Sequence, residues 1–376
     1  MSNTLGYFNP LFYANEALMA FEKSLGIASR VHRGYEQERA TFNRGEYINI
    51  KGPATFAAQD APSTAQDLAT DSIQIQLAYW REVKFKLTDK ELAFTTEQII
   101  AQHINPAAYA LARDVNEKLA ALLDLSGYET AHSSGTPVSS VVALRKGLFD
   151  QAVPKSMPLT LLVDSTMAAD MLGNASFTGA NMAGDQGADE IATGMMGRKF
   201  GFDIFESHDV AAHTAGSLSG TPLAVGAHAK GATTLSLDAA TLTGTVKRGD
   251  LLTFGSYAYA VAADATASGN AITVTIPGPG LRAALADNEA GAMTQTTRTG
   301  IGAGFARDAF ALAVGPLPEM AKNLGAQVRT VTNPASGLSM RSRLFYDGDN
   351  SSVNVALDIL YGIKTINPHF FRRYSR

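Results

Sequence analysis

The sequence contains no cysteine among its 376 residues. Disulfide bonds, thiolate metal sites and a cysteine nucleophile are therefore excluded. The net charge of −4 provides no strong electrostatic case for binding nucleic acid. No apolar run reaches the ~18 residues of a membrane span, and the N-terminal stretch lacks the basic start and apolar core of a signal peptide. We therefore expect a soluble protein, made and used in a cytoplasm, with no membrane partner.

Sequence motifs for catalysis are missing as well. Neither a phosphate-binding loop nor a nucleophilic-serine elbow is present. His208 and His213 are the one close pair among the seven histidines, and their spacing matches no metal-ligand motif, so we interpret their segment as a solvated loop. Gly300, Gly302 and Gly304 precede a segment that reads as a strand, which favours tight backbone packing over dinucleotide binding. We predict no catalytic residue, no cofactor and no metal site.

The most distinctive feature that is present is a long strand pattern over residues 71–87. Side chains alternate between polar even-numbered positions and apolar odd-numbered positions, and Arg81 is the one charged residue among the odd positions. Such a strand would reach about 50 Å. It must either project from a compact domain or bend where Arg81 interrupts the apolar face, and we expect it to project.

A second strand over residues 47–50 ends at Pro53, and a small, polar segment separates it from the long strand. Together the two strands predict a hairpin arm over about 46–89. An isolated two-stranded hairpin is marginally stable in water, so the arm needs a surface to lie on.

Helices and strands are both predicted elsewhere. Helical spacing predicts a short helix after Pro10, a long helix that Asn105 caps and Pro106 opens, and a helix after Pro137. A buried strand over 159–164 precedes a helix for which Ser165 is the expected N-cap. Near the end, strands over 341–346 and 353–361 flank a turn at 347–350.

The composition changes between about 217 and 291, where Ala, Gly, Thr and Ser dominate and short strand signals recur. Helix–strand alternation stops at the start of this segment and the earlier style resumes after it. We interpret it as a small all-β domain inserted into the rest of the chain.

The order of these segments resembles the major capsid protein of tailed bacteriophages, the Hong Kong 97 fold, and in particular the short-tailed-phage branch that carries an insertion domain. "ANEALMAFEKSLGIASRVHRGYEQE" with "RGEYINIKGPATF" resembles the N-terminal arm and the start of the extended loop. "VKFKLTDKELAFTTEQI" with "NPAAYALARDVNEKLAAL" resembles the return strand and the spine helix. "GFDIFESHDV", "GFARDAFALAVGPL" and "GLSMRSRLFYDGDNSSVNVALDILYG" resemble the axial domain and the closing strands of the peripheral domain. The similarity covers almost the whole chain, and no single motif is diagnostic.

The resemblance implies an α+β fold. Its expected parts are an N-terminal arm (1–45), an extended loop (46–90), a peripheral domain with the spine helix (91–131 and 334–376), an axial domain (132–216 and 292–333) and the inserted domain (217–291). It implies a protein that is no enzyme and that self-assembles into an icosahedral shell of hexamers and pentamers around packaged double-stranded DNA.

The resemblance also answers what the arm lies on, because in this family the hairpin lies across a neighbouring subunit. The implied subunit-interface residues are Ile73, Ile75, Leu77, Tyr79, Trp80, Arg81, Glu82, Lys84 and Lys86. Gly45 and the loop over 173–187 are the candidate hinges between hexamer and pentamer geometries. Implied partners are further copies of the chain, a scaffolding protein during assembly, a portal complex at one vertex and a decoration protein, with the DNA enclosed without sequence-specific binding. The implied location is the virion capsid, assembled in the bacterial host cytoplasm.

Three alternatives stay open. An encapsulin-type compartment shell shares the fold, but the inserted segment and the absence of a cargo signal argue against it. An enzyme with an unrecognised site conflicts with the missing catalytic groups. An adhesin or tail protein would be rich in β-structure throughout, which the long helix contradicts.

Overall fold

The computed structural model describes residues 10–33, 47–51, 60–61, 72–88, 103–178, 196–319, 326–333 and 336–376. The chain forms two compact units, one of residues 1–116 with 310–366 and the other of residues 117–309 with 367–376. Gly45, the predicted hinge, lies outside the described residues, as does most of the 173–187 loop. None of the helices in the described ranges is long and apolar enough to cross a membrane.

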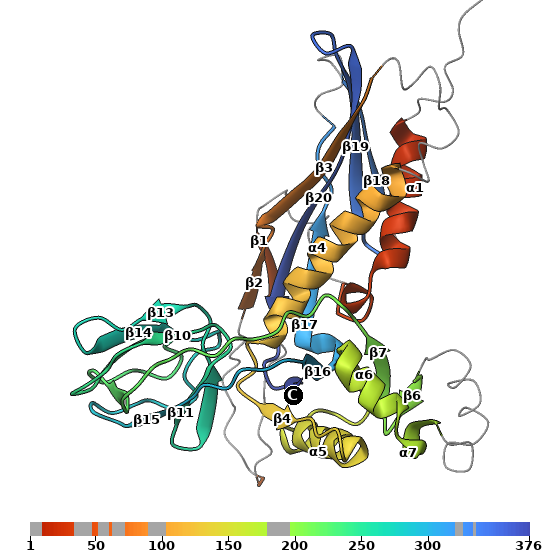
Figure 1. The fold of residues 1–376 in the computed structure, drawn as a ribbon. Coiled ribbons are helices and arrows are strands. Elements are labelled where there is room, and N and C mark those ends of the chain that lie inside the picture. Colours follow the sequence, from red (N-terminus) through yellow and green to blue (C-terminus); the bar gives the residue numbers. More distant parts are fainter. Residues whose placement is uncertain are drawn as a thin grey trace, which may run out of the picture. The chain divides into compact units, whose positions relative to one another are not determined.

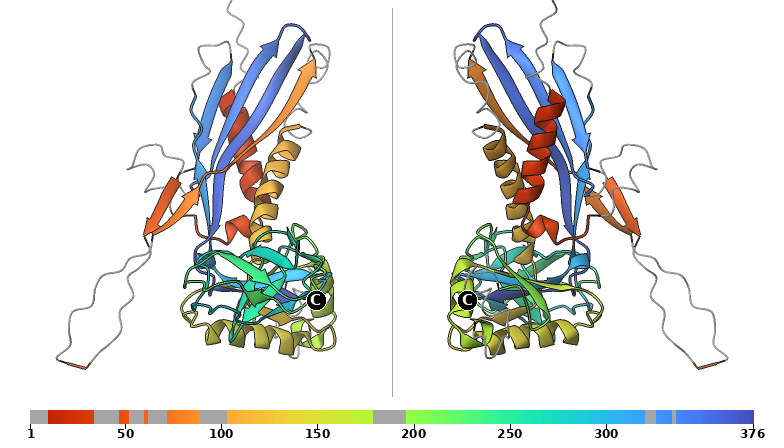
Figure 2. Two further views of the ribbon diagram at one scale, coloured as in Figure 1. Left: turned by 90° about the vertical axis from the view of Figure 1, so that its left-hand side faces the viewer. Right: turned by 90° about the vertical axis from the view of Figure 1, so that its right-hand side faces the viewer.

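The first unit is built on a five-stranded antiparallel sheet (Figures 1 and 2). Its central strand, β20, pairs with β19 and with β17 along one edge and with β3 along the other. β18 pairs with β19. The strands are β3 (Tyr79–Thr88), β17 (Phe310–Gly315), β18 (Gln327–Thr332), β19 (Ser339–Asp347) and β20 (Ser352–Thr365).

Two helices lie side by side against this sheet, α1 (Pro10–Ser24) and α4 (Asn105–Leu123), as Figure 1 shows. Both confirm the predicted helices, including the start of the longer one at Asn105 and Pro106. Their buried side chains recur at helical spacing, as a helix with one apolar face requires. A short 3-10 turn, η1 (Ile27–Ser29), follows α1. The buried positions include Tyr13, Ala14, Ala17, Leu18 and Phe21 on α1 and Ala108, Leu111, Ala112 and Val115 on α4.

The base of the predicted arm forms a separate antiparallel pair, β1 (Tyr47–Lys51) with β2 (Ser72–Gln76). Its apolar side chains, among them Ile50 and Ile75, pack with Ala311 of β17 in one buried cluster. This end of the hairpin therefore lies on its own chain.

The expectation of one projecting strand over residues 71–87 is wrong for its second half. The strand breaks at Leu77 and Ala78, and all of β3 pairs with β20 of the same chain. The cause is that β20 offers a complete ladder of backbone partners to β3. The break does not fall at Arg81, which stays inside β3.

Gly362 of β20 permits a close approach between β20 and β2. A Cβ atom at this position would lie 2.2 Å from the carbonyl oxygen of Gln76. Backbone atoms cannot move out of the way as the end of a flexible side chain can. The site therefore requires glycine for its missing Cβ rather than for an unusual backbone angle.

The second unit contains a mixed six-stranded sheet. Helices α5 (Pro137–Asp150), α6 (Ser165–Leu172) and α7 (Ala175–Thr178) belong to this unit, and side chains of α5 and α6 share a buried apolar cluster with β5 and β7. A 3-10 turn, η3 (Arg307–Ala309), follows β16. In spatial order the strands are β4 (Glu129–Ala131), β21 (Phe371–Ser375), β16 (Ile301–Ala306), β5 (Leu159–Val163), β7 (Phe202–Glu206) and β6 (Arg198–Lys199).

The glycines of β16 pack as predicted. A Cβ atom on Gly302 would lie 2.3 Å from the carbonyl oxygen of Leu162, and one on Gly304 would lie 2.9 Å from Leu144. The predicted N-cap of α6 is wrong by one residue. Asp164 is the cap, because its carboxylate accepts a hydrogen bond from the backbone N–H of Met167.

Eight short strands follow in the second unit, and they pair with one another in small sheets. We call this set the β module. It has an apolar core of its own, which includes Leu235, Leu252 and Ile272. Its strands are β8 (Leu223–Ala224), β9 (Thr234–Asp238), β10 (Thr245–Val246), β11 (Leu251–Phe254), β12 (Tyr257–Ala260), β13 (Ala265–Thr266), β14 (Ala271–Thr275) and β15 (Gly291–Thr294). Its status as an inserted domain stays a prediction.

Three predicted domain boundaries disagree with the sheets. Residues 91–131 are expected in the peripheral domain, but their last strand, β4, belongs to the six-stranded sheet of the second unit. Residues 310–333 were expected in the axial domain, but β17 and β18 belong to the sheet of the first unit. Residues 367–376 were expected in the peripheral domain, but β21 lies between β4 and β16 in the second unit. Strand pairing between segments that are far apart in the sequence decides all three cases, and local sequence patterns do not reveal such pairing.

We expect the Gly362→Ala variant to unfold with about 1–3 kcal/mol less free energy than the wild type, because its methyl group would collide with backbone. Gly348→Ala is the matched control, since nothing lies within 4 Å of a Cβ atom there. Urea denaturation followed by circular dichroism measures both. Equal stability of the two variants would contradict the close approach of β2 and β20.

We expect residues 215–296, expressed alone, to fold cooperatively, because the β module has its own core and its ends meet. The backbone groups of His213 and Arg298, just outside this segment, hydrogen-bond to each other at 3.0 and 2.9 Å. Dispersed amide resonances in an NMR spectrum would be the positive result, and the core variant Leu252→Asp is the control for loss of fold. A disordered wild-type segment would show that the β module depends on the six-stranded sheet.

Candidate subunit interface

The side chains of β3 divide between its two faces as the sequence predicts. The even-numbered residues Trp80, Glu82, Lys84 and Lys86 are exposed, and Trp80 retains 59% of its accessible surface. Among the described strands, β20 is the one partner of β3, so β3 is an edge strand. Charged residues, lysine above all, are typical of edge strands because they discourage indiscriminate strand pairing.

Four of the nine predicted interface residues are committed to their own chain. Ile73, Ile75 and Leu77 belong to the cluster that packs β1 and β2 against β17, and Ile75 is fully buried. Tyr79 stacks on Tyr361 of β20, with ring centroids 5.2 Å apart. Ile75 and Leu77 are therefore buried within the chain, which corrects their assignment to the subunit interface, whereas Ile73 and Tyr79 are partly exposed and their contact with a neighbour stays a prediction.

The Arg81 side chain is partly exposed to solvent and also contacts helix α4. Its Nε lies 3.2 Å from a carboxylate oxygen of Asp114 on α4, and the hydroxyl of Tyr361 donates to the same oxygen at 2.5 Å. Burial, followed by the adjacent Asp114 carboxylate, raises the pKa of Tyr361 above its ordinary value, so the hydroxyl keeps its proton. Arg81 therefore fastens β3 to α4.

Trp80 is fixed by a buried carboxylate. Its indole N–H donates to Asp358 of β20 at 3.0 Å, and Asp358 is fully buried. Arg341 of β19 forms a two-point contact with Asp358, at 3.0 and 2.5 Å, and the guanidinium of Arg343 lies 3.3 Å away. A bidentate arginine compensates a buried carboxylate well. The indole is thus both exposed and held in one position.

Two further exposed side chains of β3 also contact their neighbours on the sheet. Glu82 pairs with Arg343 at 3.0 Å, and the ammonium of Lys84 lies 4.7 Å from the centre of the Phe345 ring. Trp80, Glu82, Lys84 and Lys86 form what we call the β3 face, a row with one aromatic side chain, one carboxylate and two ammonium groups. Whether it contacts a second subunit stays a prediction.

A charge cluster of the second unit joins two buried arginines to the partly buried Glu129. Arg298 contacts both carboxylate oxygens of Glu129 at 2.7 Å, and Arg373 contacts one of them at 3.1 Å. Burial by itself would raise the pKa of Glu129, but Arg298, Arg373 and Ser375 outweigh it and lower the pKa to about 2. These residues come from β4, β21 and the segment before β16, so nothing in the local sequence could have revealed the cluster.

His213 corrects the interpretation of its segment as a solvated loop. Its side chain is buried, and Nε2 lies 3.0 Å from a carboxylate oxygen of Asp250, which is itself fully buried. Asp250 also accepts hydrogen bonds from the backbone of Lys247 and Gly216. Its neighbour Gly249 accepts a hydrogen bond from Arg373 through its carbonyl oxygen, at 2.9 Å. His213 therefore helps to attach the β module within its unit, whereas His208 is exposed as expected.

The carboxylate of Asp170, the imidazole of His132 and the hydroxyl of Tyr374 are connected by hydrogen bonds, but they form no active site. His132 lies 3.0 Å from Asp170 through Nε2 and 2.6 Å from the Tyr374 hydroxyl through Nδ1. Tyr374 is fully buried, and its pKa is raised by that burial, so its oxygen can reach no substrate. Across the described ranges, no three His, Asp or Glu side chains are grouped to hold a metal ion.

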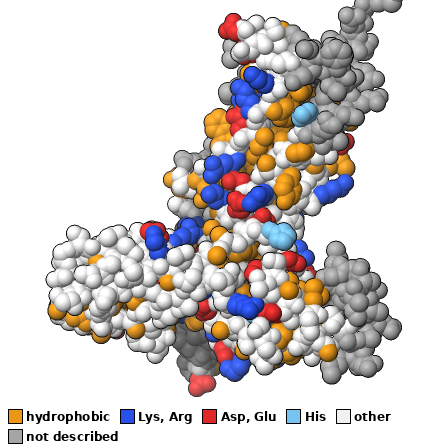
Figure 3. Space-filling view, viewed as in Figure 1, with side chains coloured by type: hydrophobic (Ala, Val, Ile, Leu, Met, Phe, Trp, Pro, Cys, Tyr) orange, Lys and Arg blue, Asp and Glu red, His pale blue; other side chains and the backbone are white. Residues whose placement is uncertain are grey.

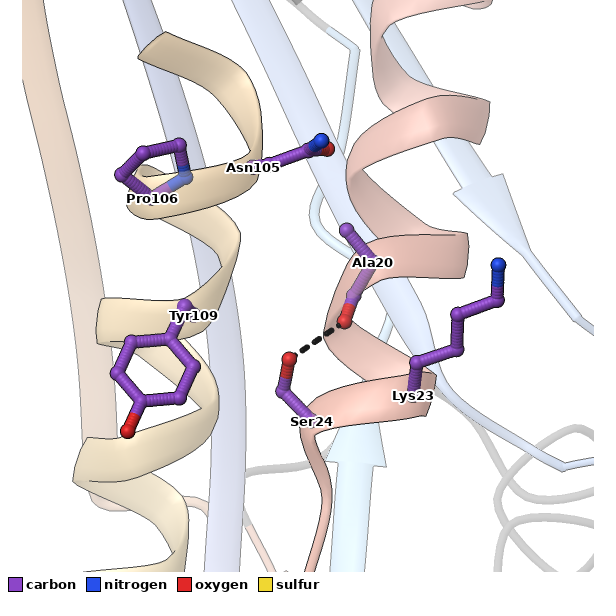
Figure 4. Close-up of a pocket in the computed structure, with 6 residues that line it drawn as sticks. All are labelled: Ala20, Lys23, Ser24, Asn105, Pro106 and Tyr109. Atoms are coloured by element: carbon purple, nitrogen blue, oxygen red, sulfur yellow. Dashed lines mark hydrogen bonds between the residues drawn. The ribbon is translucent and has the colours of Figure 1, made fainter. Parts of the chain in front are cut away.

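A groove separates α1 from α4 (Figure 4). It has a volume of about 500 Å³ and is open to solvent. The lining residues are Ala20, Lys23 and Ser24 on α1 and Asn105, Pro106 and Tyr109 on α4.

The sequence profile of the family described as "Phage capsid protein" matches residues 70–252, just under half of the chain. The fold of the chain is also similar to that of a solved phage structure. A solved structure from Mycobacterium phage Che8 aligns with a TM-score of 0.52 at 14% identity and covers 93% of this chain and 90% of its own. Residues 70–252 therefore match the phage capsid protein family, and the fold of the chain is similar to that of a phage structure.

Further solved structures align more distantly with this chain. The capsid of cyanophage P-SCSP1u has a TM-score of 0.47 and 11% identity, and covers 89% of this chain and 84% of its own. The mature capsid of bacteriophage PhiM1 has a TM-score of 0.45 and 12% identity, and covers 89% of this chain and 82% of its own. A search of curated protein sequences gives no significant match.

These comparisons confirm the predicted α+β phage coat fold and indicate a structural protein. The profile begins just before β2 and ends inside the β module, at β11. It therefore includes the β3 face. On the surface drawn in Figure 3, the β module carries few charged side chains, whereas basic and acidic side chains are mixed over the sheet and helices of the first unit.

We expect Glu129→Gln to cost about 3 kcal/mol or more of unfolding free energy at pH 7, because it leaves two buried guanidinium groups without their carboxylate. The folded pKa of about 2 lies below the ordinary 4.5, so the carboxylate stabilises the protein above about pH 4.5 and ceases to do so as the pH falls toward 2. The difference between wild type and variant must therefore shrink over that range.

Denaturant unfolding at a series of pH values measures this difference. Asp150→Asn is the control, because it removes an exposed pair with Lys146 and should cost less than about 1 kcal/mol. A difference between Glu129→Gln and wild type that stays constant from pH 7 to pH 2 would show that the Glu129 carboxylate is not the stabilising group.

Proposed function

We propose that this capsid protein assembles with copies of itself into an icosahedral shell of hexamers and pentamers that encloses the packaged double-stranded DNA of a tailed bacteriophage. The observation that carries the proposal is the match of residues 70–252 to a phage capsid family in a chain whose fold aligns over nearly its full length with a phage structure. The net charge of −4 suits a container that encloses DNA without binding its sequence.

The β3 face supports self-association in physical terms. Tryptophan is enriched at the centres of protein interfaces, and here the single tryptophan of the chain is exposed yet held in place by Asp358. A side chain that is already fixed loses little conformational entropy when a partner covers it. Trp80, Lys84 and Lys86 are therefore the residues that we assign to contact with a neighbouring subunit, together with the arm beyond β1 and β2.

The proposal extends to the setting of assembly. Shells form in the bacterial host cytoplasm with a scaffolding protein, a portal complex occupies one vertex, and the finished location is the virion capsid. Repeated contacts between identical subunits act multivalently, so each contact can be weak while the closed shell is stable.

Electron microscopy of the purified protein, expressed alone and with a scaffolding protein, tests shell formation. We expect closed shells in at least one of the two conditions, because the family and fold are those of capsids. A stable monomer or small oligomer in both conditions would contradict the proposal.

The emission of Trp80 reports on the β3 face directly, since no other tryptophan contributes. We expect the emission to shift to shorter wavelength when subunits become shells, because a neighbour would exclude water from an indole that is now 59% exposed. Shells that form without any shift would show that the β3 face stays uncovered.

Charge reversal tests the same face. We expect the double variant Lys84→Glu, Lys86→Glu to raise the concentration needed for shell formation about tenfold, or roughly 1.4 kcal/mol per contact. Lys155→Glu, on the exposed turn after α5, is the matched control. An unchanged threshold in the double variant would remove these lysines from the interface.

A further inference from the structure

Tyr128 has a fixed position beside the β module, in the segment that precedes β4. Its carbonyl oxygen accepts hydrogen bonds from the Ser126 hydroxyl, at 2.8 Å, and from the backbone N–H of Arg373, at 3.0 Å. A Cβ atom on Gly127 would lie 2.3 Å from the carbonyl oxygen of Ala258 on β12, so this segment lies directly against the β module. The backbone of Tyr128 is therefore held by both β21 and β12.

Three basic side chains from different segments lie around the Tyr128 ring, and we call Arg282, His369 and Arg372 the basic cluster. The guanidinium of Arg282, between β14 and β15, lies 4.7 Å from the ring centre, and that of Arg372 on β21 lies 5.8 Å from it. Arg282 also donates a hydrogen bond to the Tyr128 hydroxyl. The imidazole of His369, in the turn before β21, has its centre 6.2 Å from that of the Tyr128 ring. Both arginines are thus within cation–π distance of one ring.

Among the described residues, no carboxylate lies within ion-pairing distance of the basic cluster. Two carboxylates act on Arg372 from further away, and both are engaged elsewhere. Asp150 pairs with Lys146 at 2.6 Å. Glu129 pairs with Arg298 at 2.7 Å and with Arg373 at 3.1 Å. The basic cluster is therefore a local excess of positive charge in a chain whose net charge is −4.

This excess of charge has an electrostatic cost in the folded protein. Partial burial, followed by the charge of Arg282, lowers the pKa of His369 below its ordinary value. Burial also lowers the pKa of Arg372, although Asp150 and Glu129 counteract it. In both cases the surroundings disfavour the charged form of the side chain. An anion in contact with these groups would reverse that effect.

The two guanidinium groups keep N–H donors that the chain does not use. Arg372 donates through Nε to the Thr130 hydroxyl, at 2.6 Å, and through Nη2 to the carbonyl oxygen of Glu129, at 2.8 Å. Its Nη1, together with Nε and Nη2 of Arg282, has no hydrogen-bond partner among the described residues. Both side chains are partly exposed. A ligand can therefore reach donors that are already held in place.

We propose that the basic cluster binds a phosphate group, whose oxygens accept hydrogen bonds from Arg282 and Arg372 beside the imidazole of His369. Guanidinium groups suit this ligand because their planar array of donors matches the spacing of phosphate oxygens. Tyr128 positions both guanidinium groups, so little conformational entropy is lost on binding. Inorganic phosphate and a nucleic-acid backbone both carry this group, and the test separates them. The proposal does not depend on shell formation.

NMR spectroscopy of the full-length, unassembled protein follows binding through the imidazole of His369, whose resonance a His369→Gln variant identifies. We expect sodium phosphate at pH 7 to shift this resonance saturably, because a bound anion would lie beside the ring. Sodium chloride at the same ionic strength should leave it nearly unchanged, since screening alone requires no bound ion. This comparison uses the wild-type chain and needs no variant to fold.

Arg282→Gln should weaken phosphate binding at least about tenfold, because it removes a charged donor. Arg282→Lys keeps the charge without the planar array of donors and should weaken binding less. Arg145→Gln is the matched control. The Arg145 guanidinium also lies over an aromatic ring, 5.4 Å from the centre of Phe149, and has no carboxylate partner among the described residues, yet it lies outside the basic cluster. The control should bind phosphate as the wild type does.

Competition separates the two sources of the phosphate group. Displacement of phosphate by a short single-stranded oligodeoxynucleotide would assign the site to a nucleic-acid backbone, whereas phosphate binding that this DNA leaves intact would assign it to a free phosphate compound. Equal effects of phosphate and chloride, or an equal loss of affinity in Arg282→Gln and Arg145→Gln, would overturn the proposal. Shells without phosphate binding would overturn this proposal alone, and phosphate binding without shells would overturn only the proposed function.

Discussion

The ladder of backbone hydrogen bonds along β20 is the constraint on which the first unit depends. β20 binds β19 and β17 on one side and β3 on the other, and Gly362 lets β2 approach it closely. Because β3 is committed to this ladder, its side chains have only two directions available. One set meets α4 through Arg81, and the other set is left facing solvent as the β3 face. The position of the proposed subunit contact therefore follows from a strand pairing within a single chain.

The second unit depends on charge instead. Glu129 brings together two arginines from distant segments, and Asp250 holds His213 from within the β module. Buried ion pairs cost desolvation energy and stabilise only when every group has a partner. Such clusters determine which segments pack together rather than how much free energy their packing contributes. This role is consistent with a β module whose own apolar core already supplies its stability.

Sequence reasoning succeeded where the signal is local. The alternation over 73–87, the helix starting at Asn105 and the turn at 347–350 all reflect the preferences of neighbouring residues. It failed where distant segments compete: no local pattern shows that β3 has a partner in β20, or that β21 lies between β4 and β16. An ion pair at Asp358 could have been predicted from the sequence, because a carboxylate in an apolar strand needs a cationic partner. Its partners Arg341 and Arg343 lie on the adjacent strand of the hairpin, yet Trp80 could be added only from the structure.

The pairing of β3 with β20 also has a mechanical consequence. Ten residues of β3 are in register with β20, and the hydrogen bonds of an antiparallel pair run perpendicular to the strands. A force along the axis of β3 therefore loads all of these hydrogen bonds at once, in shear. A force perpendicular to the strand would break them one after another. An arm that continues from this strand is anchored to its subunit in the direction in which the pairing is strongest.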